Sequence, residues 1–362
     1  MASMTSRDRV IAAMRRRRPD RVPFDFSFGF SPYQLAEFRR RTGQDNPDDY
    51  FGADTRMVDP DQTRLETDFS AYLGELAPGA YVDEWGVGRQ PTASTDPAHS
   101  HLEGFIYPML HLPTRRDALD YPLPDIEADY RYEEAGRQIA AIQSRGLAAM
   151  AMMTCTVFEV AWNMRSMELL LMDFVDRREF ATTLLDRITA KREVQARRLA
   201  EIGADVICMG DDVGTQRGML MSPLMWRVWL KPRLARIITA ARSVRADALV
   251  FYHSDGDVTP IIPDLVEIGV DVLNPVQPEC MDPVDLKRRY GARLSFWGTI
   301  GTQTTFPFGT PDDVRREVKL RVETLGANGG LFLAPTHTIE PEVPFENIVA
   351  FVEAVKEHGG DR

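Results

Sequence analysis

A short apolar run that ends in a histidine and an aspartate is the part of this sequence that points most directly to chemistry. Residues 248–256 read ALVFYHSDG, so His253 and Asp255 follow a run of apolar residues and precede a glycine. Such a run is typical of a buried parallel strand, and ligands in parallel α/β folds bind at the carboxyl ends of the strands. The alternative is a hydrogen-bonded core histidine followed by an aspartate that caps the next helix.

Polar residues also follow the other apolar runs, which favours a shared site. Because the carboxyl ends of parallel strands meet at one face, we expect these side chains to converge there. The candidate catalytic residues are Asp211, Asp212 and His337. The candidate substrate-binding residues are Trp85, Arg89, Glu159, Gln277 and Gln303.

Two kinds of chemistry fit this set of residues. His253, Asp255 and His337 are acceptable zinc ligands, and three protein ligands would leave one coordination position open for substrate. An ideal strand would point His253 and Asp255 the same way, since they are two residues apart. Alternatively, a histidine and a carboxylate with pKa values pushed apart by their surroundings would perform acid–base catalysis.

The pattern of elements predicts the scaffold for these residues. Strands are expected at residues 21–26, around Met57 and Tyr81, and at 147–153, 205–210, 248–255, 270–275, 294–298 and 331–334. Helices are expected at residues 5–16, 31–42, 134–144, 158–172, 178–202, 223–244, 258–268, 283–290, 311–325 and 345–358. Strand and helix alternate as in βα units, and about eight strands favour a distorted (β/α)₈ barrel. We expect one domain over residues 1–362, with an irregular part at 1–133 and regular βα repeats at 134–362.

Composition narrows the class of protein. The formal net charge is −11, which disfavours nucleic-acid binding because that function needs a basic face. The sequence contains no run of the ~20 apolar residues that a membrane-spanning helix needs, and its start does not read as a signal peptide. The 3 cysteines have no close metal-ligand spacing and fit free thiols in a reducing cytoplasm.

The sequence resembles the uroporphyrinogen decarboxylase superfamily over nearly its whole length. The resemblance depends on the segments PDRVP (19–23), VDEWG (82–86), SP (222–223), KP (231–232), YHSDG (252–256), LNPVQP (273–278), MDP (281–283), GTP (309–311) and PFENI (344–348). These segments are specific for the superfamily, which includes porphyrinogen decarboxylases and zinc-dependent methyltransferases that serve corrinoid proteins and thiols. The resemblance implies a distorted (β/α)₈ barrel that is often dimeric.

Two departures separate this chain from the branches of that superfamily. Porphyrinogen decarboxylases carry an RQAGRY segment after the first strand, whereas residues 25–33 here read DFSFGFSPY and contain no arginine. The methyltransferase branch binds zinc through a His-x-Cys pair and a later cysteine. Here the pair is His253-x-Asp255 and the later position is His337, so ligand placement is kept while both thiolates are replaced. Such a site would also suit other divalent metals.

These observations favour a cytoplasmic, methyltransferase-like enzyme that acts on a small molecule. Zinc is the expected metal, a corrinoid protein is a possible partner, and a homodimer is the expected assembly. One alternative is metal-independent decarboxylation of a porphyrinogen or another acid, with Asp211, Asp212 or His337 as proton donor or charge stabiliser. Another is a barrel without catalytic activity that binds a small ligand or a corrinoid protein.

We predict that the protein does not decarboxylate uroporphyrinogen. Ionised acetate groups that enter a site without paired arginines stay uncompensated, and a buried unpaired charge costs several kcal/mol. Anaerobic incubation with uroporphyrinogen, followed by chromatography of the products, measures this directly. Efficient formation of coproporphyrinogen would show that other arginines, such as Arg56 or Arg89, replace the missing segment.

Overall fold

Seven parallel strands form a curled sheet at the centre of the molecule. The computed structural model describes residues 4–91, 103–153 and 155–360. The strand order is β1-β5-β6-β9-β10-β11-β12, with every neighbouring pair parallel. The strands are β1 Thr55–Val58, β5 Ala148–Met153, β6 Val206–Gly210, β9 Leu249–His253, β10 Val272–Asn274, β11 Ser295–Ile300 and β12 Leu331–Pro335.

An extended segment at residues 22–26 closes the barrel between β12 and β1. On one side, the Leu333 N–H donates to Pro23 O (2.9 Å) and the Asp25 N–H donates to Leu333 O (3.2 Å). On the other side, the Asp54 N–H donates to Phe24 O (2.9 Å). The prediction of a regular strand at 21–26 was wrong, since only isolated bridges form and Pro23 has no N–H to donate. The predicted (β/α)₈ class is nevertheless confirmed, in a distorted form.

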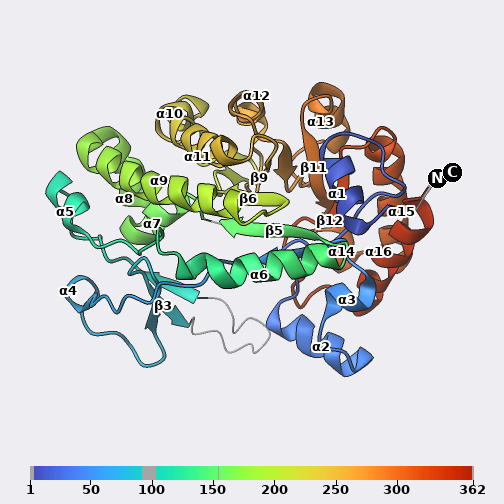
Figure 1. Cartoon of the computed structure of the whole chain (residues 1–362), viewed down its shortest axis with the longest axis horizontal. Coiled ribbons are helices and arrows are strands. Elements are labelled where there is room, and N and C mark those ends of the chain that lie inside the picture. Colours follow the sequence, from blue (N-terminus) through green and yellow to red (C-terminus); the bar gives the residue numbers. More distant parts are fainter. Residues whose placement is uncertain (1–3, 92–102, 154, 361–362) are drawn as a thin grey trace.

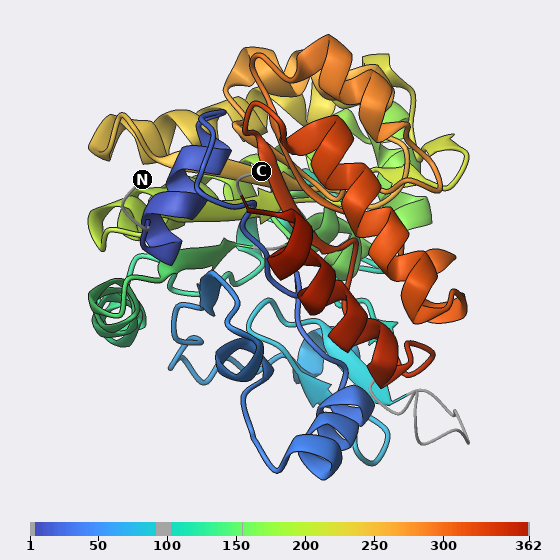
Figure 2. The ribbon, with the colours of Figure 1, turned by 90° about the vertical axis from the view of Figure 1, so that its right-hand side faces the viewer.

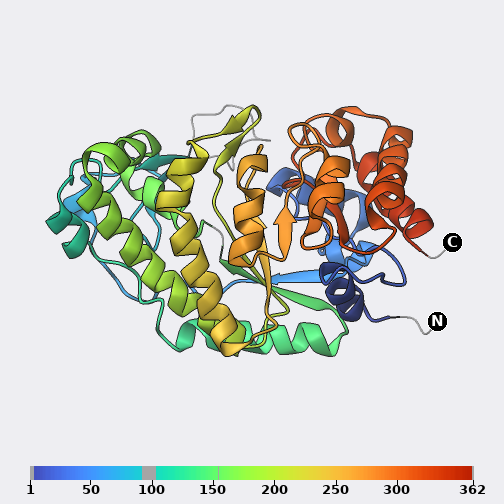
Figure 3. The ribbon, with the colours of Figure 1, turned by 90° about the horizontal axis from the view of Figure 1, so that it is seen from above.

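Helices cover the outside of the sheet, as Figures 1 and 3 show. In Figure 3, α9 and α11 (green to yellow) flank one side, and α15 and α16 (red) flank the other. The helices that follow β5 and the later barrel strands are α7 Phe158–Arg165, α8 Met167–Asp176, α9 Arg178–Glu201, α10 Pro223–Trp229, α11 Lys231–Val244, α12 Ile262–Ile268, α13 Pro283–Tyr290, α14 Thr305–Phe308, α15 Pro311–Arg321 and α16 Phe345–His358. Short 3₁₀ and π turns, at Thr259–Ile261 and Val322–Gly326, adjoin α12 and α15.

Two helices predicted as continuous are each divided in two. The expected helix at 158–172 breaks at Ser166, whose φ of 76° is left-handed and whose hydroxyl accepts from the Leu169 N–H (3.3 Å) to cap α8. The expected helix at 223–244 breaks at Leu230, just before Lys231 and Pro232. Pro232 has no N–H to donate to the carbonyl four residues earlier, so the hydrogen bonds of one continuous helix are interrupted here.

The N-terminal part contains more regular structure than predicted. Its elements are α1 Ser6–Met14, α2 Pro32–Thr42, α3 Pro47–Phe51, α4 Ser70–Leu73, β2 Tyr81–Val82, β3 Gly88–Pro91, β4 Glu103–Ile106, α5 Arg115–Asp120 and α6 Tyr130–Ser144. Strands β2, β3 and β4 form a separate antiparallel sheet, and β7 Gly214–Thr215 pairs with β8 Gly218–Met219. Figures 1 and 2 show α2, α3 and β3 below the barrel. Within the described residues, no helix is long and apolar enough to cross a membrane.

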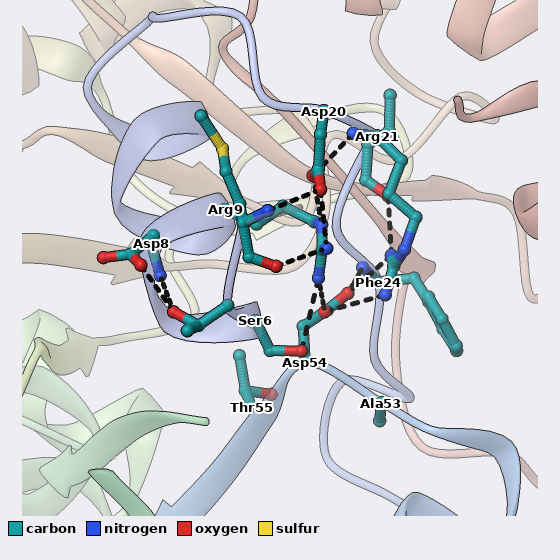
Figure 4. Close-up of polar contacts among 12 residues, drawn as sticks. Ser6, Asp8, Arg9, Asp20, Arg21, Phe24, Ala53, Asp54 and Thr55 are labelled. Carbon is teal, nitrogen blue, oxygen red and sulfur yellow. Dashed lines mark hydrogen bonds and ion pairs between the residues drawn. The ribbon is translucent and has the colours of Figure 1, made fainter. Parts of the chain in front are cut away.

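A buried carboxylate joins the N-terminal segment to the start of β1 (Figure 4). Asp54 is fully buried and pairs with Arg9 of α1 and with Arg21, each at 2.8 Å. Asp54 Oδ2 also accepts from the Phe24 N–H (2.9 Å). Helix α1 in turn covers the amino end of the barrel, where Ser295 Oγ donates to Met14 O (2.8 Å). One carboxylate therefore holds both α1 and the segment that closes the barrel.

We predict that Asp54→Ala strongly destabilises the protein. The change leaves two guanidinium groups without their shared carboxylate, and breaking a buried ion pair costs about 3–5 kcal/mol. Asp247→Ala is the matched control, because Asp247 pairs with Arg15 (3.0 Å) at the surface, where an ion pair contributes about 1 kcal/mol or less. Urea unfolding followed by circular dichroism measures both. Equal shifts of the two midpoints would contradict the role assigned to Asp54.

Candidate active site

Two histidines and an aspartate lie together at the carboxyl ends of β9 and β12. Ligand atoms of His253, Asp255 and His337 all lie within 4.8 Å of one another. His253 Nε2 is 3.9 Å from Asp255 Oδ1, and His337 Nε2 is 4.0 Å from Asp255 Oδ2. His253 is the last residue of β9, and His337 follows β12 by two residues. The structure thus brings together the three residues that the sequence suggested as metal ligands.

Asn274 fixes the orientation of the His253 ring. Asn274 ends the neighbouring strand β10, and its Oδ1 lies 2.6 Å from His253 Nδ1. Because an amide oxygen can only accept, Nδ1 donates this hydrogen bond, and Nε2 faces the carboxylates. Asn274 Nδ2 donates to Trp297 O (3.4 Å), which keeps the amide from turning over. Asn274 was recognised from the sequence as a residue at a strand end, within LNPVQP, but was not among the candidate site residues.

A phenylalanine covers both histidine rings. The Phe28 ring is perpendicular to that of His253 at 4.8 Å between centroids, and it is 5.5 Å from that of His337. Phe28 belongs to the arginine-free segment at 25–33, so this segment contributes an apolar cover over the cluster. The His253 side chain is 11% exposed and the His337 side chain is 46% exposed, which leaves the cluster open on the side of His337.

Asp211 and Asp212, although adjacent, occupy different environments. Asp212 Oδ1 is 3.5 Å from His253 Nε2 and accepts from the Asp255 N–H (2.7 Å), so its carboxylate faces the cluster. The buried Asp211 carboxylate accepts from the Val157 N–H (2.9 Å) and the Glu159 N–H (3.0 Å) at the start of α7. Burial raises the pKa of Asp211 to about 6, although these backbone hydrogen bonds oppose the rise. Asp211 is therefore placed to hold the loop before α7.

Glu159 connects this loop to the cluster. Its Oε2 accepts from the Asp212 N–H (3.1 Å), so it supports the backbone that carries Asp212. Burial raises the pKa of Glu159 well above its ordinary value, and the negative charges of Asp212 and Asp211 raise it further. Burial also raises the pKa of Asp255, while His253 and His337 lower it. Carboxyl groups thus crowd around the histidines in a partly desolvated environment.

The other predicted residues lie in two separate cavities. The first, which we name the histidine chamber, has a volume of about 460 Å³, and its lining includes Asp255, Gln277, Gln303 and His337. The second, which we name the arginine chamber, has a volume of about 280 Å³, and its lining includes Trp85, Arg89, Arg131 and Arg192. Arg56, the other arginine considered from sequence, pairs with Asp49 instead and lines neither chamber. Glu159 lines neither chamber, so the five residues proposed to contact one substrate are not in one pocket.

A buried carboxyl group lies beneath the cluster and was not among the sequence candidates. Asp25 accepts from the Ser27 N–H (2.8 Å), from Thr55 Oγ1 (2.7 Å) and from Trp297 Nε1 (3.2 Å). Complete burial raises its pKa from 3.8 to about 7, against the effect of these hydrogen bonds. Asp25 joins the closing segment to β1 and β11, because Thr55 belongs to β1 and Trp297 to β11.

Comparisons with known proteins agree with this architecture. A family model described as uroporphyrinogen decarboxylase matches residues 108–358. Uroporphyrinogen decarboxylases from Thermus thermophilus and Coxiella burnetii are 27% and 23% identical over 176 and 177 residues, covering 48% of this chain and 48% and 46% of theirs. The chain thus spans about half the length of these curated relatives. A methyltransferase from Methanosarcina mazei shares the fold, with a TM-score of 0.67 and 20% identity over 98% of this chain and 99% of that one.

We predict that Asp25 makes stability depend on pH. The pKa of Asp25 is higher in the folded protein, about 7, than its ordinary value of 3.8, so the folded protein binds this proton more tightly than the unfolded chain does. This contribution is fully present below pH 3.8 and is lost as the pH rises through about 7, at about 1.4 kcal/mol per pH unit at most. The difference between wild type and Asp25→Asn in free energy of unfolding should therefore shift in favour of the variant between pH 5 and 8. A constant difference across that range would contradict the raised pKa.

Proposed function

Because the chain belongs to the uroporphyrinogen decarboxylase family, we propose that it is a metal-dependent, methyltransferase-like enzyme that acts on a small molecule. The observation that carries this proposal is the convergence of His253, Asp255 and His337 within 4.8 Å. The Methanosarcina mazei protein with the same fold is named a methyltransferase, which is the reaction type we adopt. A corrinoid protein as methyl carrier and a homodimeric, cytoplasmic enzyme complete the proposal.

The residues of the cluster fit a divalent metal, with zinc as our first choice. Two imidazole nitrogens and one carboxylate oxygen form a ligand set that zinc accepts in catalytic sites. The Asn274 hydrogen bond to His253 Nδ1 leaves Nε2 free for coordination, an arrangement common in metal-binding histidines. When bound there, a metal would lower the pKa of a thiol in the open coordination position and so make it a better nucleophile.

The surrounding residues position the reactants. The Asp212 carboxylate, which faces His253, accepts the proton that a substrate thiol releases. Gln277 Oε1 accepts from the Gly256 N–H (3.2 Å) and so fixes the turn that carries Asp255. Phe28 shields the two histidines, which limits competition from water. Asp211 stabilises the loop before α7, and Glu159 stabilises the backbone at Asp212.

A second function, metal-independent decarboxylation, draws support from the convergence of carboxyl groups and histidines in the same cluster. A carboxyl or imidazole group placed beside the substrate can supply the proton that replaces carbon dioxide. In this alternative Asp212 or His337 is the proton donor, because the Asp211 carboxylate is occupied by backbone donors at α7. The two functions differ in whether removing the metal removes activity.

We predict that the purified protein binds about one zinc ion per chain. His253→Ala should reduce the zinc content to near zero, because only Asp255 and His337 remain as ligands. His111→Ala is the control, since His111 is an exposed histidine remote in sequence from the cluster. Elemental analysis of protein purified without a histidine tag or chelator measures the stoichiometry. A value near zero that stays there after zinc is added back would refute the metal and leave the acid–base function of the same residues.

Activity is tested by methyl transfer from free methylcobalamin to a small thiol, followed by visible absorbance. We expect the zinc-loaded protein to accelerate this transfer and the metal-free and His253→Ala proteins not to do so. Equal rates with and without metal would contradict the proposed role of the cluster.

A further inference from the structure

A cavity with two basic side chains and no acidic ones in its described lining lies at the amino end of the barrel. Its volume is about 470 Å³, and its charged lining residues are Arg16 and Lys287. Arg16 follows α1, and Lys287 lies in the last turn of α13, so the two cations come from distant parts of the chain. In Figure 1, α1, β11 and α13 lie on the same side of the molecule. The other described residues of the lining are uncharged: Gly291, Ala292, Thr324, Leu325, Ala327 and Asn328.

This cavity, which we name the amino-end cavity, is at the opposite end of the barrel from the histidine cluster. Gly330 immediately precedes β12 and Ser295 begins β11, whereas the histidines lie at the carboxyl ends of β9 and β12. A Cβ atom on Gly330 would be 3.1 Å from Lys287 Nζ and 3.3 Å from Arg16 Cγ. Both basic side chains therefore lie against Gly330, whose left-handed φ of 76° favours glycine.

Neither of these two side chains has a carboxylate partner within the part of the chain that the structure describes. Lys287 Nζ donates to Gly329 O (2.6 Å) and lies 6.0 Å from the centre of the Phe296 ring. Arg16 Nη1 donates to Met14 O (3.4 Å). An ammonium group has three N–H donors and a guanidinium group has five, so most of the donors on these two groups remain for a ligand.

Basic residues next to these two do have carboxylate partners. Arg15 pairs with Asp247 (3.0 Å). On α13, Arg288 and Arg289 both pair with Asp285, at 2.5 and 3.2 Å. The chain contains 54 acidic and 43 basic residues, so a shortage of acids does not explain why the amino-end cavity has none in its described lining.

The environment of the amino-end cavity disfavours two positive charges without an anion. Burial lowers the pKa of Lys287, and the positive charge of Arg16 lowers it further. An anion held by both groups would oppose both effects, because it attracts each cation and replaces hydration that burial has removed. A dianion matches the two positive charges best.

We propose that the amino-end cavity binds the phosphate group of a small molecule. The Lys287 ammonium would contact one phosphate oxygen as a point charge, and the planar Arg16 guanidinium would donate two parallel hydrogen bonds. A volume of about 470 Å³ lies within the ~300–1,000 Å³ typical of small-molecule pockets, so it leaves room for the organic part of a phosphomonoester beside Ala292 and Leu325. This site goes beyond the proposed function, because it shares no residue with the histidine cluster and needs no metal.

The test compares anions of different charge on the full chain. Isothermal titration at about pH 7, where a phosphate group carries about −1.5 to −2 charges, and in about 0.15 M sodium chloride should give saturable binding of inorganic phosphate and of glycerol 3-phosphate. Acetate should bind at least about tenfold more weakly, because it carries one charge and has fewer acceptor oxygens. Tighter binding of glycerol 3-phosphate would identify a phosphomonoester as the ligand, and equal affinities would identify phosphate itself. Acetate that binds as tightly as phosphate, or no saturable binding of either phosphate, would overturn the proposal.

Variants locate the site. Lys287→Gln and Arg16→Gln each remove one of the two cations without breaking an ion pair, and each should weaken phosphate binding by about tenfold or more. Circular dichroism establishes that both variants are folded. The control is Arg288→Gln, which removes a positive charge from the same helix at a side chain that is 75% exposed, and which should leave the affinity unchanged. Unchanged affinity in both cavity variants, or an equal loss in the control, would show that phosphate binds elsewhere and would overturn the assignment.

Discussion

The closure of the barrel by residues 22–26 is the constraint on which the rest of the structure depends. Pro23 lacks an N–H, so the few backbone hydrogen bonds to Leu333 and Asp54 are supplemented by side chains. The buried Asp54 carboxylate supplies that support, since it binds Arg9, Arg21 and the Phe24 N–H together. The chain then runs directly to Phe28, which covers the two histidines. The segment that Asp54 holds through Arg21 and the Phe24 N–H therefore also carries Phe28, the residue that covers the site.

Inside the barrel, a chain of hydrogen bonds connects the same segment to the site. Asp25 accepts from the Trp297 indole, the Trp297 carbonyl accepts from Asn274, and Asn274 Oδ1 accepts from His253. Each link is buried, so each is stronger than it would be in water and more costly to break. The orientation of the His253 imidazole thus depends on four elements: the closing segment, β9, β10 and β11.

The two chambers differ in the residues that line them. The histidine chamber is lined by Asp255 and His337 of the proposed metal cluster, and the arginine chamber is lined by three arginines and three acidic residues. The acidic residues Asp211, Asp212 and Glu159 also have different structural roles. Asp212 faces His253, whereas Asp211 and Glu159 receive backbone N–H groups and so stabilise the intervening loops.

The sequence alone was sufficient to predict the (β/α)₈ class and the grouping of His253, Asp255 and His337. Both depend on apolar runs that end in polar residues, a local pattern that the parallel arrangement of strands converts into proximity. It did not show the break at Ser166, because the residues on both sides favour a helix. Pro232 is a sequence signal for the break at Leu230, but the prediction of one helix at 223–244 did not use it. Only the tertiary structure showed that Asn274 orients His253, and that Trp85 and Arg89 lie in a different chamber from Gln277 and Gln303. These relations join residues far apart in the chain, and such distances are set by the packing of the whole barrel and not by any local pattern.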